Sequence, residues 1–189
     1  EWHSNNYQFI LPAIDNYEEK IFDMNSWLTF FGIWIAEGWA HTGSDIRYRI
    51  EFAINKQRVK DVLFEAINNM GYSYTINCEK LTICDKQLHT YMVKLSVGAP
   101  NKKLPDWVWN LSKMQCRKLI YAMQLGDGSF NNNTKCSMYY TSSIRLADDF
   151  QRLCIHAGWT GIISKHLEAG NKNIIRGKEV VTNYDIWRI

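Results

Sequence analysis

Two carboxylates occupy equivalent positions in two similar apolar segments. Glu37 follows the run FFGIWIA, and Asp127 follows the run IYAMQLG 90 residues later. Each acid directly precedes a glycine, Gly38 or Gly128, at which a helix is expected to end. The negative end of the helix dipole lies there, so folding alone does not favour two acids at these places. A divalent cation that prefers oxygen ligands, such as Mg²⁺, would offset their repulsion.

Small residues recur four positions apart in both segments, at Gly32 and Ala36 and again at Ala122 and Gly126. On a helix, residues with this spacing share one face and allow two backbones to approach closely. If the two helices pack through these faces, the two carboxylates meet. The alternative is that the acids are exposed ends of two unrelated helices.

An internal repeat argues against that alternative. Aligning Gly71 with Gly158, an offset of 87 residues, places apolar positions of 59–76 on apolar positions of 146–163. An offset of 90 residues does the same for the two acid-bearing segments. The order of elements is the same twice, which predicts two similar halves related by a pseudo-twofold axis.

Each half is expected to contain an acid-bearing helix, an alternating strand, an amphipathic helix and further strands. In the first half the predicted helices are 24–36 and 59–70, and the strands 46–54, 74–78, 81–84 and 91–97. In the second half the predicted helices are 113–126 and 146–157, and the strands 136–142, 161–167 and 179–189. Asp23 and a capping box from Ser112 to Gln115 are expected to start the acid-bearing helices.

The paired segments and the repeat resemble the LAGLIDADG homing endonucleases in their single-chain, two-motif form, over about residues 23–189. The resemblance implies an α+β fold of two pseudo-symmetric αββαββα halves, with a two-helix interface and a saddle of antiparallel sheets. It divides the chain into an N-terminal arm (1–22), a first half (23–104) and a second half (105–189). It implies a site-specific endonuclease that makes a metal-dependent double-strand break in a long double-stranded DNA target. With both halves on one chain, the protein is expected to be a monomer.

The resemblance also assigns the metal site. Glu37 and Asp127 match the metal-binding acids of the family. The backbone carbonyls of Ala36 and Gly126 are further expected ligands. The metal is expected to be Mg²⁺, with Mn²⁺ as a substitute.

The segment NKKLP at 101–105 resembles the K-x-[IL]-P segment of the family and assigns Lys102 as the central basic residue. A lysine there can polarise water or stabilise charge in the transition state. The alternative is an exposed basic turn. No second copy exists, because the same spacing of 65 residues from Asp127 gives position 192, beyond residue 189. Either the second lysine lies elsewhere, with Lys165, Lys172 and Lys178 as candidates, or the sequence stops short of it. Without a second lysine, one half-site would be catalytically poor, and the protein would nick DNA or fail to cut it.

Alternation in the predicted strand 46–54 places Arg47, Arg49 and Glu51 on its polar face. A two-stranded ribbon fits the major groove of DNA, and arginine pairs with guanine there. The next strand and the repeat add further expected DNA contacts, namely Asn77, Ser164 and His166. The alternative for all of them is a solvated strand face.

Composition excludes several classes of protein. The chain is 46% hydrophobic and 22% charged, with a net charge of +3, which is typical of a globular domain. Its longest apolar run has ten residues, whereas a membrane span needs about 20. Five cysteines without a C-x-x-C pair argue against a zinc site or a disulfide scaffold and favour an intracellular location.

A second function stays open, that of a cleavage-deficient nucleic-acid binder with the same fold, similar to a maturase or a regulator. The missing second lysine favours it. Some members of the family lie within inteins, and residues 1–15 are a candidate connection to a splicing domain, although Glu1 and Ile189 carry no splicing chemistry. The sequence leaves open whether the protein is free-standing, intron-encoded or intein-borne.

Overall fold

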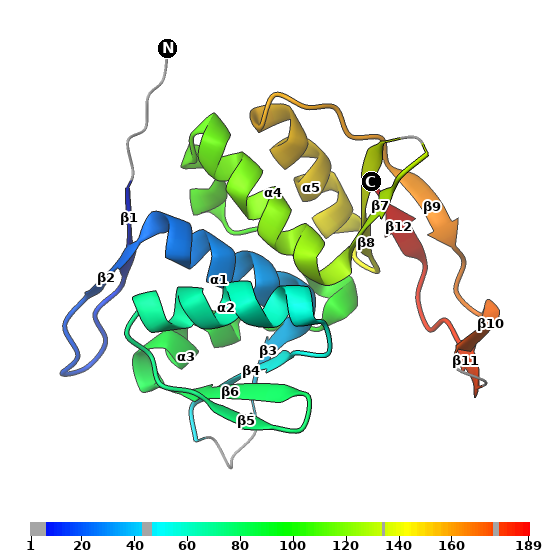
Figure 1. The fold of residues 1–189 in the computed structure, drawn as a ribbon. Coiled ribbons are helices and arrows are strands. Elements are labelled where there is room, and N and C mark those ends of the chain that lie inside the picture. The colour runs from blue at the N-terminus through cyan, green and yellow to red at the C-terminus, as the bar shows by residue number, and fades with distance from the viewer. Residues whose placement is uncertain (1–6, 43–46, 134, 176–177) are drawn as a thin grey trace.

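Helices and antiparallel strands make up the fold (Figure 1). The computed structural model describes residues 7–42, 47–133, 135–175 and 178–189. The acid-bearing helices, α1 (Met24–Glu37) and α4 (Lys113–Asp127), pack against each other at the centre. A second helix flanks each of them, α2 (Gln57–Asn69) in the first half and α5 (Ile144–His156) in the second. No helix in the described part of the chain is long and apolar enough to cross a membrane.

Each half contributes a four-stranded antiparallel sheet, ordered β3-β4-β6-β5 in the first half and β7-β8-β12-β9 in the second. The strands of the first sheet are β3 (Gly38–Ala40), β4 (Arg49–Ala53), β5 (Thr75–Asn77) and β6 (Lys80–Cys84). Those of the second are β7 (Gly128–Asn131), β8 (Cys136–Thr141), β9 (Ser164–Leu167) and β12 (Ile186–Arg188). The expected α+β class is therefore confirmed.

The two halves differ at their ends. Helix α3 (Lys86–Met92) completes the order αββαββα in the first half, and three 3₁₀ turns lead from it to α4. These turns are Val93–Leu95, Ala99–Asn101 and Asp106–Asn110. In the second half a hairpin of β10 (Lys172–Ile175) and β11 (Lys178–Val181) separates β9 from β12. Among the residues that the structure describes, β12 is the last element of the second half.

Both acid-bearing helices start where the sequence predicts. Asp23 accepts a backbone N–H of the first turn of α1 at 2.9 Å, and Ser112 with Gln115 forms the capping box of α4. Both helices also end at the predicted glycines, but for a steric reason. Gly38 is extended, with φ −112°, and a Cβ there would lie 2.3 Å from the Trp34 ring. The glycine that ends α4 is crowded in the same way by its own helix.

The small residues form the interface between the two helices. A Cβ on Gly32 would lie 2.5 Å from the Cβ of Ala122, and a Cβ on Gly126 would lie 2.5 Å from the Cβ of Ala36. Ala122 is the repeat counterpart of Gly32, and Gly126 is that of Ala36. Each small residue therefore meets its own counterpart, as a twofold axis between the helices requires.

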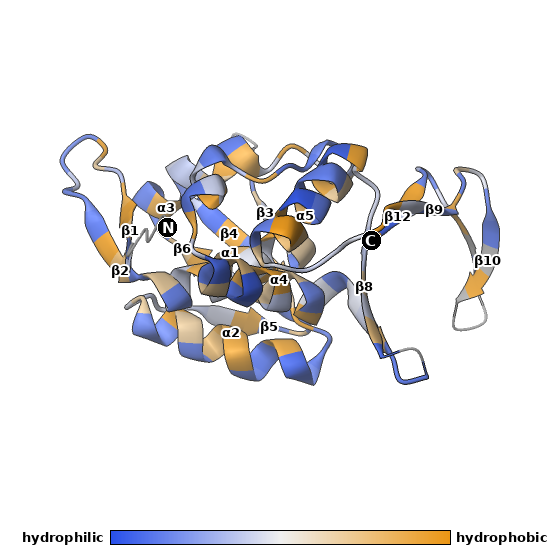
Figure 2. Cartoon of the chain, turned by 90° about the horizontal axis from the view of Figure 1, so that it is seen from above, coloured by the Kyte–Doolittle hydropathy of each residue, from blue (hydrophilic) through white to orange (hydrophobic). Residues whose placement is uncertain are grey.

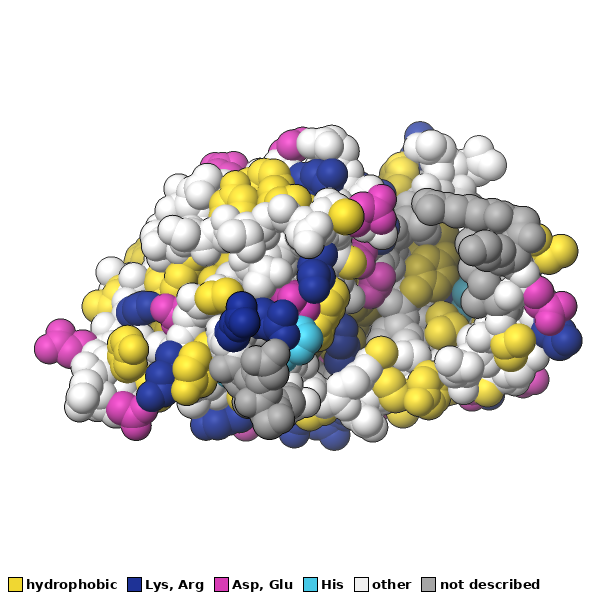
Figure 3. All heavy atoms as spheres, turned by 90° about the horizontal axis from the view of Figure 1, so that it is seen from below, with side chains coloured by type: hydrophobic (Ala, Val, Ile, Leu, Met, Phe, Trp, Pro, Cys, Tyr) yellow, Lys and Arg dark blue, Asp and Glu magenta, His cyan; other side chains and the backbone are white. Residues whose placement is uncertain are grey.

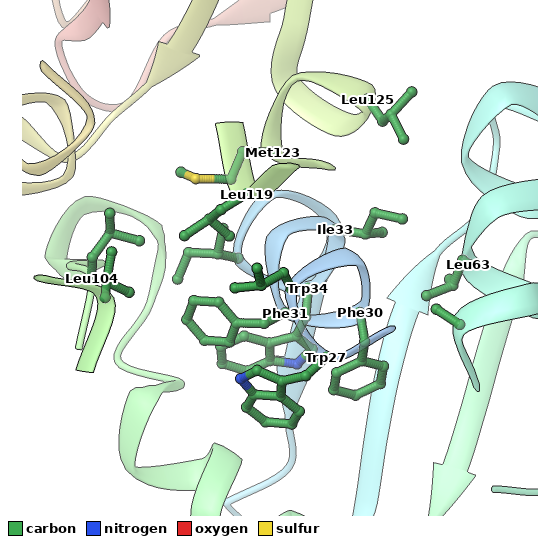
Figure 4. Close-up of a cluster of buried hydrophobic side chains, with 14 of the residues drawn as sticks. Trp27, Phe30, Phe31, Ile33, Trp34, Leu63, Leu104, Leu119, Met123 and Leu125 are labelled. Carbon is green, nitrogen blue, oxygen red and sulfur yellow. The ribbon is translucent and has the colours of Figure 1, made fainter. Parts of the chain in front are cut away.

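The core is built around the apolar side chains of α1 (Figure 4). Trp27 and Trp34 are fully buried. Phe9 stacks on Trp27 with ring centroids 3.7 Å apart. It belongs to β1 (Gln8–Leu11), which pairs with β2 (Lys20–Asp23) in a hairpin that leads into α1. The segment before the repeat thus adds to the core of the first half.

The predicted strand 91–97 is wrong, because its first residues belong to α3 and the next to a 3₁₀ turn. Asp85 starts α3 by accepting the N–H of Leu88 at 2.7 Å. Leu88 and Met92, four positions apart, are fully buried. The alternating apolar residues from Tyr91 to Val97 concealed this helical spacing.

The predicted strand 46–54 is too long. Strand β4 begins at Arg49, because Tyr48 adopts φ 49°, which an extended strand does not allow. Arg47 precedes the strand and is exposed. Residue 46 lies outside the described residues.

Replacing Gly32 by alanine tests the close approach of the helices. The added methyl group would meet the Cβ of Ala122 at 2.5 Å, so the helices must separate. We expect the free energy of unfolding to fall by about 1–3 kcal/mol, as in other overpacked cores. The double variant Gly32→Ala/Ala122→Gly removes the clashing methyl group and should recover most of this loss. Chemical denaturation of both variants and of Ala122→Gly measures the coupling. A double variant less stable than Gly32→Ala would contradict the pairing.

Candidate metal centre and nucleic-acid interface

The close packing of α1 on α4 brings Glu37 and Asp127 together. A Cβ on Gly126 would lie 3.0 Å from Cγ of Glu37, so the Glu37 side chain lies against the end of α4. Burial, and after it the charge of Glu37, raises the pKa of Asp127 to about 6, although two lysines act in the opposite direction. Burial and the charge of Glu37 therefore both disfavour the charged form of Asp127.

One lysine, Lys56, contacts Glu37 of this pair directly. Its Nζ lies 2.6 Å from Oε1 of Glu37 and also donates to the backbone carbonyl of Gly126. Lys56 belongs to the start of α2 and was not identified from the sequence. Its only signal was its place directly before the amphipathic helix.

Lys102 lies at the end of α1. Its Nζ donates to the carbonyls of Ile35 at 2.6 Å and of Ala36 at 3.4 Å. The second half holds the segment, since the Ser143 hydroxyl donates to the backbone carbonyl of Lys102 at 2.6 Å. Burial lowers the pKa of Lys102, and the two acids only partly offset this effect. Lys102 is therefore half-buried at the end of α1 and is not an exposed turn, while its catalytic role stays a prediction.

The oxygen atoms at this place suit a hard divalent cation. The carboxylates of Glu37 and Asp127 and the carbonyls of Ala36 and Gly126 form a set without nitrogen or sulfur, which is typical of Mg²⁺ and Mn²⁺. An ammonium group already contacts two of these oxygens, so the position attracts a cation. No group of three or more His, Cys, Asp or Glu that could hold a metal occurs in the described ranges, and this site offers only two carboxylates beside its carbonyls. The metal assignment itself stays a prediction.

The first sheet has a polar face turned away from the helices. Seen from below, Lys, Arg and His side chains gather beside the hollow between the two halves (Figure 3). Arg49 is half-buried on β4, and its Nε has no hydrogen-bond partner in the part of the chain that is described. Asn77 is exposed on β5. Arg49 and Asn77 thus lie where DNA contact was predicted, and Arg47 lies just outside the strand.

The predicted DNA contact of Glu51 is wrong. Its side chain is only 2% exposed, and its carboxylate lies 2.6 Å from Nε2 of His41 and 2.9 Å from Nζ of Lys80. Burial raises the pKa of Glu51, but the hydrogen bonds and charges of His41 and Lys80 outweigh it, and the pKa is lowered. The carboxylate has no access to a base. Glu51 instead anchors two basic side chains on this face, and neither was predicted.

The second sheet presents Ser164 and His166 on its outer face. The register pairs Arg188 of β12 with Ser164 and with Tyr140, and the Tyr140 and His166 rings lie 5.0 Å apart. Arg188 therefore joins this face. The sequence did not assign it, because the predicted strand 179–189 merged β11 with β12, which the structure separates by a connection.

The lysines proposed as a second central residue lie elsewhere. Lys165 pairs with Asp185 at 2.8 Å, and Lys172 pairs with Glu179 at 3.1 Å on the β10–β11 hairpin. This hairpin lies at one end of the molecule and the β1–β2 hairpin at the other (Figure 2). The side chain of Lys178 is outside the described residues. Neither Lys165 nor Lys172 reaches the acid pair.

This architecture is found in solved structures of the homing endonuclease I-DmoI. Its mesophilic variants match with a TM-score of 0.54 at 11% identity, over 87% of each chain. I-DmoI in complex with DNA and Ca matches with a TM-score of 0.56 at 12% identity, over 87% of this chain and 81% of that chain. At this identity the likeness shows the fold alone. The chain has the fold of a LAGLIDADG homing endonuclease.

Two curated relatives are closer in sequence. A DNA-directed RNA polymerase subunit beta C-terminal section from Stigeoclonium helveticum is 38% identical, over 100% of this chain and 21% of its own length. An ATP-dependent Clp protease proteolytic subunit from Chlamydomonas moewusii is 36% identical, again over 100% of this chain and 21% of its own length. The chain thus spans about a fifth of these relatives. No family model matches it.

The raised pKa of Asp127 sets a pH dependence of stability. Its value of about 6 in the folded protein lies above the ordinary 3.8, so the folded state binds more protons between these values. The stability of the metal-free protein should therefore fall as the pH rises through this window. We expect Asp127→Asn to be more stable than wild type at pH 7, by on the order of 2 kcal/mol, and not at pH 4.

Denaturation in EDTA at the two pH values measures this difference. Asp148→Asn, at an exposed position of α5, controls for the loss of one negative charge. An Asp127→Asn variant that follows wild type at both pH values would contradict the raised pKa.

Proposed function

We propose that the protein is a site-specific endonuclease that cuts both strands of a long DNA duplex as a monomer, with Mg²⁺ or Mn²⁺. The acid pair of Glu37 and Asp127 carries this proposal. Packing places the two carboxylates close together, and the burial of Asp127 beside the charge of Glu37 costs stability that nothing in the fold requires. Groups with strongly shifted pKa values in such places are typical of functional sites.

The roles follow from the surroundings of the acids. Glu37, Asp127 and the carbonyls of Ala36 and Gly126 would hold the cation. A bound divalent cation polarises the scissile phosphate and neutralises charge that develops on it. Lys102 lies beside this position, so its Nζ can donate to the phosphate or exchange a proton with the attacking water.

The outer faces of the two sheets are the proposed DNA-binding surfaces. The first presents Arg47, Arg49 and Asn77, and the second presents Ser164 and His166. Such side chains contact phosphates and base edges. Structures of I-DmoI in complex with DNA and Ca, and with DNA and Mn, support this placement through the shared fold.

The two curated relatives support a further element of the proposal. One is named for RNA polymerase and the other for a protease, yet all of this chain aligns with about a fifth of each. Insertion of the same element into two genes would produce this pattern. We therefore propose that the chain is the endonuclease part of an insert within a host protein, such as an intein.

Cleavage of a plasmid library tests the function. The library holds candidate insertion sites, including the uninterrupted joints of the genes of the two relatives, and is incubated in parallel with Mg²⁺ and with EDTA. The expected result is a double-strand break at one sequence that requires Mg²⁺. Binding without breaks would favour the cleavage-deficient binder instead.

Glu37→Gln and Asp127→Asn separate binding from cleavage. Each change removes one charged ligand while keeping the shape of the side chain. We expect cleavage to fall by about 100-fold or more, while a gel-shift assay in EDTA gives binding close to that of wild type. Cleavage that survives both changes would rule out the metal assignment.

Arg188→Ala tests the second sheet. Loss of one cationic contact should weaken DNA binding by about 1–3 kcal/mol and reduce its dependence on salt. Arg152→Gln is the control, because Arg152 lies on helix α5 and not on the sheet. Its guanidinium lies over the Trp109 ring at 4.0 Å. Equal weakening by both changes would mean that the effect comes from total charge.

A further inference from the structure

The end of α1 shows what a central lysine contacts in this fold. Lys102 Nζ donates to the carbonyls of Ile35 and Ala36, in the last turn of the helix. The repeat counterparts of these residues, 90 positions later, are Leu125 and Gly126. Whatever donates to these two carbonyls holds the equivalent place in the second half.

The start of α2, in the first half, supplies those donors. Arg58 Nε donates to the carbonyl of Leu125 at 2.9 Å, and Lys56 Nζ donates to the carbonyl of Gly126. Lys56 Nζ also lies 2.6 Å from Oε1 of Glu37. The last turn of each acid-bearing helix is therefore covered by cationic side chains.

The position of Lys56 within its helix is a separate observation. Lys56 is the N-cap residue of α2, and its side chain makes no capping hydrogen bond. The repeat counterpart, 87 positions later, is Ser143, which caps α5 by accepting the N–H of Leu146 at 3.1 Å. Lysine is a poor N-cap, and its charge opposes the positive end of the helix dipole. Lys56 thus weakens the start of α2, and what it provides in exchange is its contact with Glu37 and Gly126.

We infer that Lys56 does for α4 what Lys102 does for α1, so that it is the second central lysine of the site. This inference rests on the proposed function. Lys56 is a positioning residue, because its ammonium holds Glu37 and the end of α4 in place while the site lacks metal and DNA. Through these contacts Lys56 would govern the cleavage of one strand, as Lys102 would govern that of the other.

Lys56→Ser is the variant of choice, because it gives α2 the N-cap that α5 already has and so protects folding. Mn²⁺ binding to the DNA-free protein is followed by electron paramagnetic resonance. Removal of the ammonium from Glu37 and Gly126 frees two ligand atoms, so the affinity for Mn²⁺ should rise by about tenfold. Lys56→Arg, which keeps the charge, and Lys60→Gln, one turn along α2, should both stay within about twofold of wild type. Unchanged affinity in Lys56→Ser overturns the inference.

The second readout is the rate of cleavage of each strand. The duplex recovered from the plasmid library is labelled at either end and digested in Mg²⁺. We expect Lys56→Ser to slow one strand by about tenfold or more and to leave the other within about twofold. Lys102→Met should slow the opposite strand, and Lys56→Arg should recover part of the lost rate. If Lys56→Ser slows both strands alike, or neither, the inference is overturned.

The two readouts separate the inference from the proposed function. If wild type binds Mn²⁺ but cuts no DNA, the proposed function fails, and the comparison of Mn²⁺ affinities alone decides on Lys56. If wild type neither binds Mn²⁺ nor cuts DNA, both are overturned.

Discussion

The close contact between α1 and α4 is the constraint on which the rest of the structure depends. At Gly32 and Gly126 not even a methyl group fits between the helices. This contact brings the two carboxylates together and so concentrates negative charge at the helix ends. The lysines there stabilise this charge, and the oxygen atoms that they contact are among those proposed to bind a divalent cation. The sheets are placed by the same contact, because each follows directly from the end of an acid-bearing helix.

Several local features at the site oppose folding, and the core offsets them. Burial and the charge of Glu37 raise the pKa of Asp127, and α2 starts at a lysine that does not cap it. A short distance away, Phe9 and Phe31 pack around Trp27 in an aromatic cluster with full burial of the indole. Natural proteins commonly break local rules at functional sites and compensate elsewhere. Here the compensation lies mainly on α1, the helix that also carries Glu37.

Much of this architecture could be predicted from the sequence, because local signals determine it. The acid-bearing helices have caps, small residues at a fixed spacing and a repeat. Prediction failed where residues distant in the sequence determine the burial or the contacts of a side chain. Glu51 followed the alternation of its strand, but its burial depends on His41, which follows β3, and on Lys80 of β6. The second lysine was sought in the second half because the repeat points there. The group in its place comes instead from α2, and no spacing along the chain reveals a contact that crosses between halves.

The two central lysines both come from the same half of the chain. Lys102 reaches α1 and Lys56 reaches α4, while the position equivalent to Lys56 has become the serine that holds the Lys102 segment. A homodimer of first halves would bring four lysines to two glutamates, and a homodimer of second halves would bring none of these lysines. Neither half, paired with a copy of itself, would therefore reproduce a site with one lysine for each acid. Each half now depends on the other for a complete site.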